Sequence, residues 1–138
     1  MTADQPRRTN TGPGKVLVAV YAVFAIAATA RAGLQLATRY AEAPTAYLLS
    51  AFAALIYLVA TVTLALGTRA ARPVAWAAIG IELIGVLGVG TLSLLDPAAF
   101  PRATVWSSFG MGYGFVPLVL PILGLIWLWR TRPTRPVR

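Results

Sequence analysis

The sequence contains no cysteine and no histidine, and it has only four acidic residues among 138. Without cysteine, the chain can form no disulfide, hold no iron–sulfur cluster and perform no thiolate chemistry, and its redox compartment stays open. Without histidine and with so few carboxylates, it has little with which to bind a transition metal or to carry out acid–base catalysis. We therefore expect a non-enzymatic protein with no cofactor and no metal site.

Charge of either sign is scarce, whereas apolar residues are abundant. Charged residues make up 12% and hydrophobic residues 58% of the chain, and the mean hydropathy is +0.72. Soluble domains contain about 25% charged and about 45–50% apolar residues, and a soluble domain of this size leaves roughly a third of its surface in water. The composition argues against a soluble enzyme, a disordered protein and a secreted disulfide module. It indicates a small integral membrane protein.

Four apolar segments are long enough to cross a bilayer, which takes about 20 residues. Short connections place consecutive helices side by side and antiparallel. The sequence therefore predicts an all-α membrane protein with four transmembrane helices in an up-down-up-down bundle. The expected helices are about 16–38, 46–67, 74–95 and 110–129, within a membrane domain at 15–130, a disordered tail at 1–14 and a basic tail at 131–138.

The basic residues indicate the orientation. Twelve bases against four acids give a net charge of +8, and the bases gather at the ends of the apolar segments. This placement is typical of membrane orientation and argues against nucleic-acid binding. The two tails and the second connection hold most of the bases, so we expect both termini to be cytoplasmic, the plasma membrane to be the location, and anionic lipids of the cytoplasmic leaflet to be partners.

The first segment has a second interpretation. Arg7, Arg8 and Lys15 followed by apolar residues 16–30 also fit a signal peptide, with small-x-small cleavage sites around residues 28–32. Cleavage would leave three spans with the same cytoplasmic second connection and C-terminus, so the count of basic residues does not exclude it. The apolar pattern resumes after Arg31, which favours an uncleaved helix.

Three polar residues interrupt the apolar segments and form a candidate intramembrane site: Arg31, Gln35 and Glu82. A charge near the middle of a span costs at least about 2.5–3.5 kcal/mol, so Glu82 should face the bundle interior. The Cα atoms of Arg31 and Glu82 should differ by roughly 9 Å in depth, which an arginine side chain can largely cover. The site is then a structural ion pair, or a site for an ion, a proton or an anionic substrate. In a third interpretation, Arg31 turns outward and leaves Glu82 alone.

Glycines, prolines and aromatic residues supply further expectations. The glycines predict close helix packing within the chain or in a homodimer: Gly33, Gly85, Gly88, Gly110 and Gly114. Pro117 and Pro121 predict a kink in the fourth helix, of the kind that lines transporter cavities or is simply tolerated. Tyr21 is expected near the cytoplasmic interface, and Trp106 and Tyr113 near the opposite one.

Several stretches resemble small four-helix integral membrane proteins of actinobacteria, a group of uncharacterised function. They are residues 21–38, 47–60, 96–114 and 128–130. The resemblance covers most of the chain, rests on overall texture, and implies a plasma-membrane location without an activity. Small multidrug-resistance transporters also have four helices and one essential membrane glutamate, but theirs lies in the first helix, where this chain has Arg31. Quinone-linked thiol oxidoreductases require cysteine.

Two functions remain on these grounds. The first is an accessory or assembly partner in a homo-oligomer or a larger membrane complex. The alternative is a small oligomeric transporter or channel that uses Glu82 and Arg31 as its intramembrane site.

Overall fold

The computed structural model describes residues 9–132, and every regular element within that range is helical. This confirms the predicted helical class. The long helices are α1 (Pro13–Thr38), α2 (Pro44–Leu66) and α3 (Arg72–Leu95), and α4 (Val116–Arg130) is shorter. Three short 3₁₀ helices lie in the connections: η1 (Tyr40–Glu42), η2 (Pro97–Ala99) and η3 (Ser107–Tyr113).

A proline lies in the first turn of each α-helix, where a missing backbone N–H leaves no hydrogen bond unmade. These prolines are Pro13, Pro44, Pro73 and Pro117. At the other end of α2, Gly67 adopts a left-handed conformation with φ of 62° and closes the helix. The first three helices consequently begin and end within three residues of the predicted limits.

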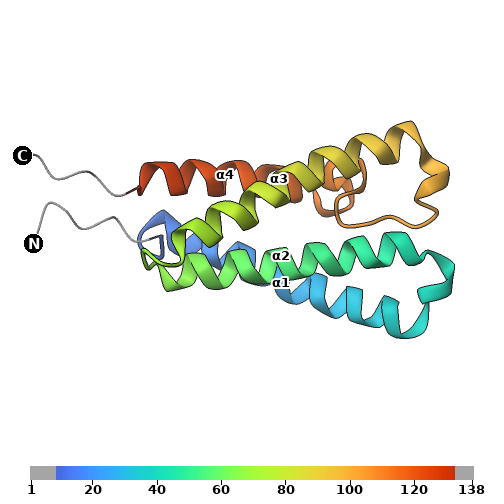
Figure 1. Ribbon diagram of the computed structural model, residues 1–138, viewed down its shortest axis with the longest axis horizontal. Helices are drawn as coiled ribbons and strands as arrows, with labels where there is room; N and C mark the ends of the chain where they lie inside the picture. Colours follow the sequence, from blue (N-terminus) through green and yellow to red (C-terminus); the bar gives the residue numbers. More distant parts are fainter. Residues whose placement is uncertain (1–8, 133–138) are drawn as a thin grey trace, which may run out of the picture.

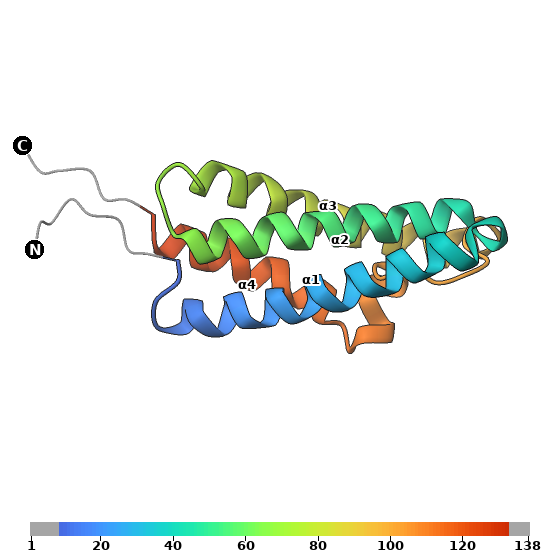
Figure 2. The ribbon, with the colours of Figure 1, turned by 90° about the horizontal axis from the view of Figure 1, so that it is seen from below.

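The helices form an elongated bundle with the two ends of the described chain at the same end of the molecule (Figures 1 and 2). α1, α2 and α3 run along its length, whereas α4 occupies only the part nearest the termini. The three long helices are each long and apolar enough to cross a membrane. α4 is only about 22 Å long at 1.5 Å per residue, and it passes the same test only together with η3, from which it is bent by 100°. The structure therefore has three candidate spans, or four if the bent pair is one span.

The fourth helix starts later than predicted. Residues 110–115 are not α-helical, and Ser108, Phe109 and Gly110 have left-handed φ values of 51°, 60° and 81°. Left-handed backbone costs roughly 1–2 kcal/mol for each residue with a Cβ, so a regular helix cannot continue through this stretch. Pro117 lies in the first turn of α4, so it does not kink the helix as predicted, because no helical hydrogen bond is lost there. Pro121 lies inside the helix.

The segment before α1 is also more ordered than expected. Thr9 Oγ1 donates to the Leu64 carbonyl oxygen at 2.6 Å, and Asn10 Nδ2 donates to the Ala65 carbonyl oxygen at 2.8 Å. These contacts satisfy carbonyl groups at the end of α2 that lack helical partners. The expected tail at 1–14 thus contributes residues 9–14 to the fold, while residues 1–8 and 133–138 lie outside the described chain.

The outward faces of the helices are apolar, and the bundle interior holds the larger aromatic residues. Ile26 and Ile84 are 70% and 73% exposed, whereas Tyr21, Tyr57 and Trp106 are buried. Water would penalise such an apolar exterior, but a bilayer does not. The surface therefore agrees with helices that lie in a membrane.

Candidate functional site

Glu82 is the centre of the candidate site, and it lies in the middle of α3 with no exposed surface. Ala75 and Ala78 precede it on the same face of the helix and are also buried, so the predicted inward orientation is confirmed. The Tyr21 hydroxyl donates a hydrogen bond of 2.7 Å to Glu82 Oε1. Glu82 Oε2 has no hydrogen-bond partner among residues 9–132.

Tyr21 reaches Glu82 because the two residues lie at similar depths on α1 and α3, and their side chains meet in the interior of the bundle. Tyr21 comes eight residues after the start of α1 and Glu82 ten residues after the start of α3, which is roughly 12–15 Å from the end where both helices begin. A Cβ on Gly124 of α4 would lie only 3.2 Å from the Tyr21 hydroxyl. The small residue in α4 thus leaves room for that hydroxyl. Tyr21 is a core residue without exposed surface, and its expected depth near the cytoplasmic interface stays a prediction.

Arg31 and Gln35 do not join Glu82. The Arg31 guanidinium donates to the Tyr113 hydroxyl and lies over the Tyr113 ring, with Cζ at 5.6 Å from its centroid. Gln35 is half-buried one turn further along α1. Of the interpretations that the sequence left open, the one in which Arg31 turns away from the carboxyl group matches the structure.

Trp106 closes the bundle beside Glu82. We expected this residue at the membrane interface, but only 2% of it is exposed, and a Cβ on Gly85 would lie 2.5 Å from its ring. The Trp106 indole N–H donates to the Tyr57 hydroxyl at 3.1 Å. Because Gly85 is one turn from Glu82, the connection between α3 and α4 brings a side chain from the far end of the molecule to the middle of the bundle.

Side-chain hydroxyls satisfy the irregular backbone of this connection. Thr104 Oγ1 accepts from the Trp106 N–H at 3.1 Å, Ser107 Oγ accepts from the Thr104 N–H at 2.8 Å, and Ser93 Oγ of α3 accepts from the Ser108 N–H at 2.8 Å. Non-helical backbone is tolerated within a bilayer only where protein groups or a cavity satisfy it. These hydroxyls let the connection enter the bundle without a complete helix.

The predicted packing glycines divide into two groups. Gly85 and Gly110 make close contacts, with Trp106 and with Pro117, whose ring lies 2.7 Å from where a Gly110 Cβ would be. Gly33, Gly88 and Gly114 would place a Cβ in open space, with no atom within 4 Å. Gly110 and Gly114 lie on irregular backbone, so they do not form the helix face that their spacing suggested.

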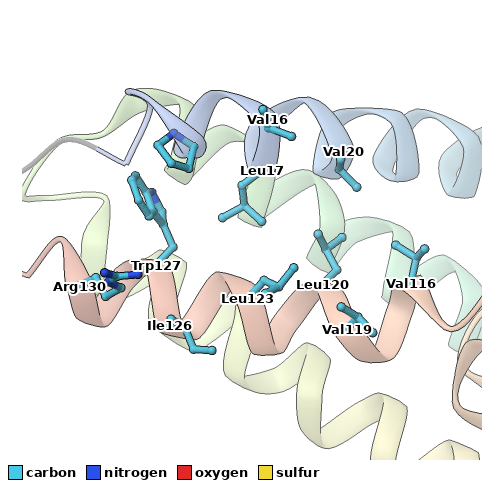
Figure 3. Close-up of a pocket in the computed structure, with 11 residues that line it drawn as sticks. Val16, Leu17, Val20, Val116, Val119, Leu120, Leu123, Ile126, Trp127 and Arg130 are labelled. Carbon is cyan, nitrogen blue, oxygen red and sulfur yellow. The ribbon is translucent and has the colours of Figure 1, made fainter.

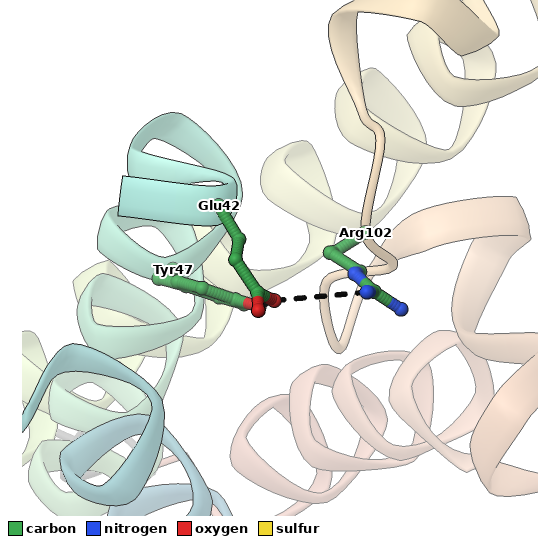
Figure 4. Close-up of polar contacts among 3 residues, drawn as sticks. All are labelled: Glu42, Tyr47 and Arg102. Carbon is green, nitrogen blue, oxygen red and sulfur yellow. Dashed lines mark hydrogen bonds and ion pairs between the residues drawn. The ribbon is translucent and has the colours of Figure 1, made fainter. Parts of the chain in front are cut away.

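Polar contacts lie at both ends of the bundle, one exposed and one buried. At the end far from the termini, Arg102 Nη2 lies 3.6 Å from Glu42 Oε2, which also accepts a hydrogen bond of 3.3 Å from Tyr47 (Figure 4). At the opposite end, the buried Arg72 donates to the carbonyl oxygens of Leu128 and Thr131. This cation satisfies the last carbonyl groups of α4 and fixes that helix to the start of α3.

Sequence reasoning missed the aromatic part of the site. Tyr57 lies near the middle of the second apolar segment, and its hydroxyl group at that depth was a usable signal. The sequence did not indicate a buried position for Trp106, because this residue lies in an irregular connection whose path cannot be inferred from hydrophobic periodicity. Tyr21 was found, but its position near one end of a segment suggested an interface.

Among the residues that the structure describes, one hydrogen-bond donor contacts the buried Glu82 carboxyl group, and one of its oxygens has no hydrogen-bond partner. Such an oxygen can take a proton or contact a cation, either of which would relieve the cost of an isolated buried charge. Within residues 9–132, no three carboxylates come together as a metal-binding cluster.

Comparisons with protein-family models, with curated proteins and with solved structures give no match. The resemblance to actinobacterial membrane proteins therefore stays a prediction.

Proposed function

We propose that the protein is a small, non-enzymatic, multi-pass transporter or channel of the plasma membrane, with Glu82 as its proton- or cation-binding site. The observation that carries this proposal is the Glu82 carboxyl group, which is fully buried at mid-helix and has one oxygen without a hydrogen-bond partner in the described part of the chain. Ionisable groups inside membrane spans are functional sites by default, because their cost must be compensated.

The position of Arg31, which does not pair with Glu82, supports this proposal. A buried carboxylate with an arginine partner would be neutralised within the chain and would have little need of a ligand. Here the guanidinium of Arg31 is engaged with Tyr113 instead. Tyr21 supplies one hydrogen bond to Oε1, and Oε2 remains as the position for a proton or a small cation.

The interrupted fourth helix also supports a transport function. Transporters commonly form their sites from discontinuous helices near the middle of the membrane. In this chain, η3 and α4 are separated by a 100° bend, and Trp106 from the preceding connection packs one turn from Glu82. Movement of this connection would change access to the carboxyl group.

The proposed arrangement across the membrane is an up-down-up-down bundle with both termini in the cytoplasm. It is supported by the basic residues in the two tails and in the second connection or beside them, among them Lys15, Arg72 and Arg130. It also requires the bent pair of η3 and α4 to serve as one span. The hydrogen bond from Tyr21 to Glu82 supports retention of the first helix in the mature protein.

Flux measurements test the proposal directly. Purified protein in proteoliposomes should dissipate an imposed proton, sodium or potassium gradient, read with a pH-sensitive dye or ion-selective fluorophores. Glu82→Gln should abolish this flux, because the amide can neither release a proton nor balance a cation. Glu42→Gln is the matched control, since that carboxylate is exposed at the rim. Absence of flux for the wild type, or full flux for Glu82→Gln, would refute the proposal.

An accessory or assembly role is the second candidate, and the open glycines favour it. Gly33 on α1 and Gly88 on α3 face outward with no atom within 4 Å, and Thr29 and Ala37 on either side of Gly33 are exposed as well. Small-residue surfaces of this kind allow another membrane helix to approach closely. If this role is correct, proteoliposomes will show no flux, and Gly33→Leu will release a protein partner or a second copy in mild detergent.

A further inference from the structure

An apolar groove lies between the first turns of α1 and the length of α4 (Figure 3). Its volume is about 450 Å³, and its walls include Val16, Leu17 and Val20 from α1 and Leu120 and Leu123 from α4. Trp127 and Arg130 stand at the end nearest the chain termini. The groove therefore runs along the helices, is lined by apolar side chains, and has the basic side chain of Arg130 at one end.

A second apolar hollow adjoins it on the other side of a ridge formed by Val16 and Val20. This hollow has a volume of about 420 Å³ and is lined by Lys15 and Phe24, besides the two ridge residues and neighbouring alanine and valine. The two hollows are similar in size and share the ridge. Both hollows thus include apolar surface of α1, and each has one basic residue in its lining, Arg130 in the first and Lys15 in the second.

Among residues 9–132, the charged side chains at this end of the bundle are all basic. Lys15 and Arg130 line the hollows and are exposed. The acidic residues of the described chain lie elsewhere, Glu82 in the middle of α3 and Glu42 and Asp96 at the far end. Basic pockets between membrane helices bind anionic headgroups, because the cations attract phosphate while the tails stay in apolar surroundings.

We propose that these hollows bind one anionic phospholipid. Its two acyl chains lie on either side of the Val16–Val20 ridge, and its phosphate lies between Lys15 and Arg130. The Trp127 indole N–H donates to Thr9, so the end of the groove is a fixed wall. This site is separate from Glu82 and does not depend on a transport function.

Native mass spectrometry of the detergent-purified protein tests the site. Phosphatidylglycerol and phosphatidylcholine with identical chains are added separately, and the lipid-bound fraction is measured. The wild type should retain one phosphatidylglycerol in preference to phosphatidylcholine. Lys15→Gln with Arg130→Gln should weaken phosphatidylglycerol retention by roughly 30-fold. Arg39→Gln with Arg102→Gln removes the same charge at the far end and should leave retention unchanged.

A second pair of variants tests the groove itself. Leu123→Trp fills the groove and keeps the charge, so it should also abolish retention of the lipid. Ile84→Trp adds the same bulk on an exposed face of α3 outside both hollows and should have no effect. If Leu123→Trp does not fold, as judged by circular dichroism, Val119→Trp in the same wall replaces it.

Three results would overturn the proposal. Equal retention of the two lipids would mean that the site does not select a headgroup. Unchanged retention in Leu123→Trp would mean adsorption to a basic surface without insertion into the groove. A wild-type mass of two copies without lipid, reduced to one copy by Leu123→Trp, would mean that a second copy of the chain fills the groove.

Discussion

At the scale of single residues, one hydrogen bond connects the first helix to the buried carboxyl group of the third. A hydrogen bond that involves a charged group contributes about 1.5–3 kcal/mol in soluble proteins, but polar pairs in membranes average closer to 0.6 kcal/mol. Tyr21 and Glu82 are both without exposed surface, so their bond has no competition from water. Arg31 makes its polar contact with Tyr113 instead.

We predict that Tyr21 and Glu82 are energetically coupled and that Arg31 and Glu82 are not. In double-mutant cycles, Tyr21→Phe with Glu82→Leu should show a coupling of about 0.5–1.7 kcal/mol. The losses from Arg31→Leu and Glu82→Leu should simply add, because these residues do not meet. The measurement is unfolding in mixed detergent micelles. A coupling between Arg31 and Glu82 as large as that of Tyr21 would contradict the structure.

At the scale of elements, the connection between α3 and α4 contributes to the packing of the bundle interior as a helix would. It carries Trp106 to the Tyr57 hydroxyl in the middle of the bundle and places the ring against Gly85. α4 can then be short, because the connection fills the half of the bundle that a full helix would have occupied (Figure 1). Arg72 holds the opposite end of α4 through its terminal carbonyl groups.

Two glycines on α3 provide a matched test of this packing. Gly85→Ala places a Cβ 2.5 Å from the Trp106 ring and should lower the unfolding free energy by about 1–3 kcal/mol, as overpacking does. The Cβ added by Gly88→Ala would lie in open space, so this variant should be neutral or should stabilise the helix by up to about 1 kcal/mol. Thermal unfolding gives the energies, and tryptophan emission should shift to the red only for Gly85→Ala. Equal stability of the two variants would exclude the Trp106 contact.

At the scale of the whole molecule, three long helices and one interrupted element form a bundle with an apolar exterior. Both ends of the described chain lie together, and basic residues dominate that end. The far end carries the Glu42–Arg102 contact, which contributes little to stability because it is exposed. An asymmetric charge distribution of this kind orients a protein in the membrane.

Single cysteines should reveal the orientation, since the natural chain has none. An impermeant thiol reagent should label Ala98→Cys in intact cells and Thr68→Cys only after permeabilisation. Val105→Cys should resist labelling from either side, because this residue is buried in the bundle. Labelling of Thr68→Cys in intact cells would show that the orientation is opposite to the proposed one. Ready labelling of Val105→Cys would show that the connection between α3 and α4 lies outside the bundle.

The sequence by itself determined the three long helices and the inward orientation of Glu82. A run of about 20 apolar residues can satisfy its backbone in a bilayer only as a helix. The cost of exposing a charged side chain to lipid predicted that the face with Ala75, Ala78 and Glu82 points toward the interior. These conclusions follow from costs that act on one segment alone.

Only the tertiary structure decided which partner Glu82 has and where the fourth helix begins. Helix periodicity fixes a face, but it does not fix the rotation and depth of one helix against another, so Tyr21 rather than Arg31 reaches the carboxyl group. The stretch 110–115 is apolar enough for a helix, yet its backbone is left-handed at Gly114 and Phe115. At the break itself, the N–H groups of Gly114 and Phe115 donate to the carbonyl oxygens of Met111 and Gly110. In the stretch before it, the hydroxyls of Ser93 and Thr104 accept from the N–H groups of Ser108 and Trp106. Such contacts form only once the chain has folded, and irregular backbone is tolerated in a bilayer only where protein groups satisfy it.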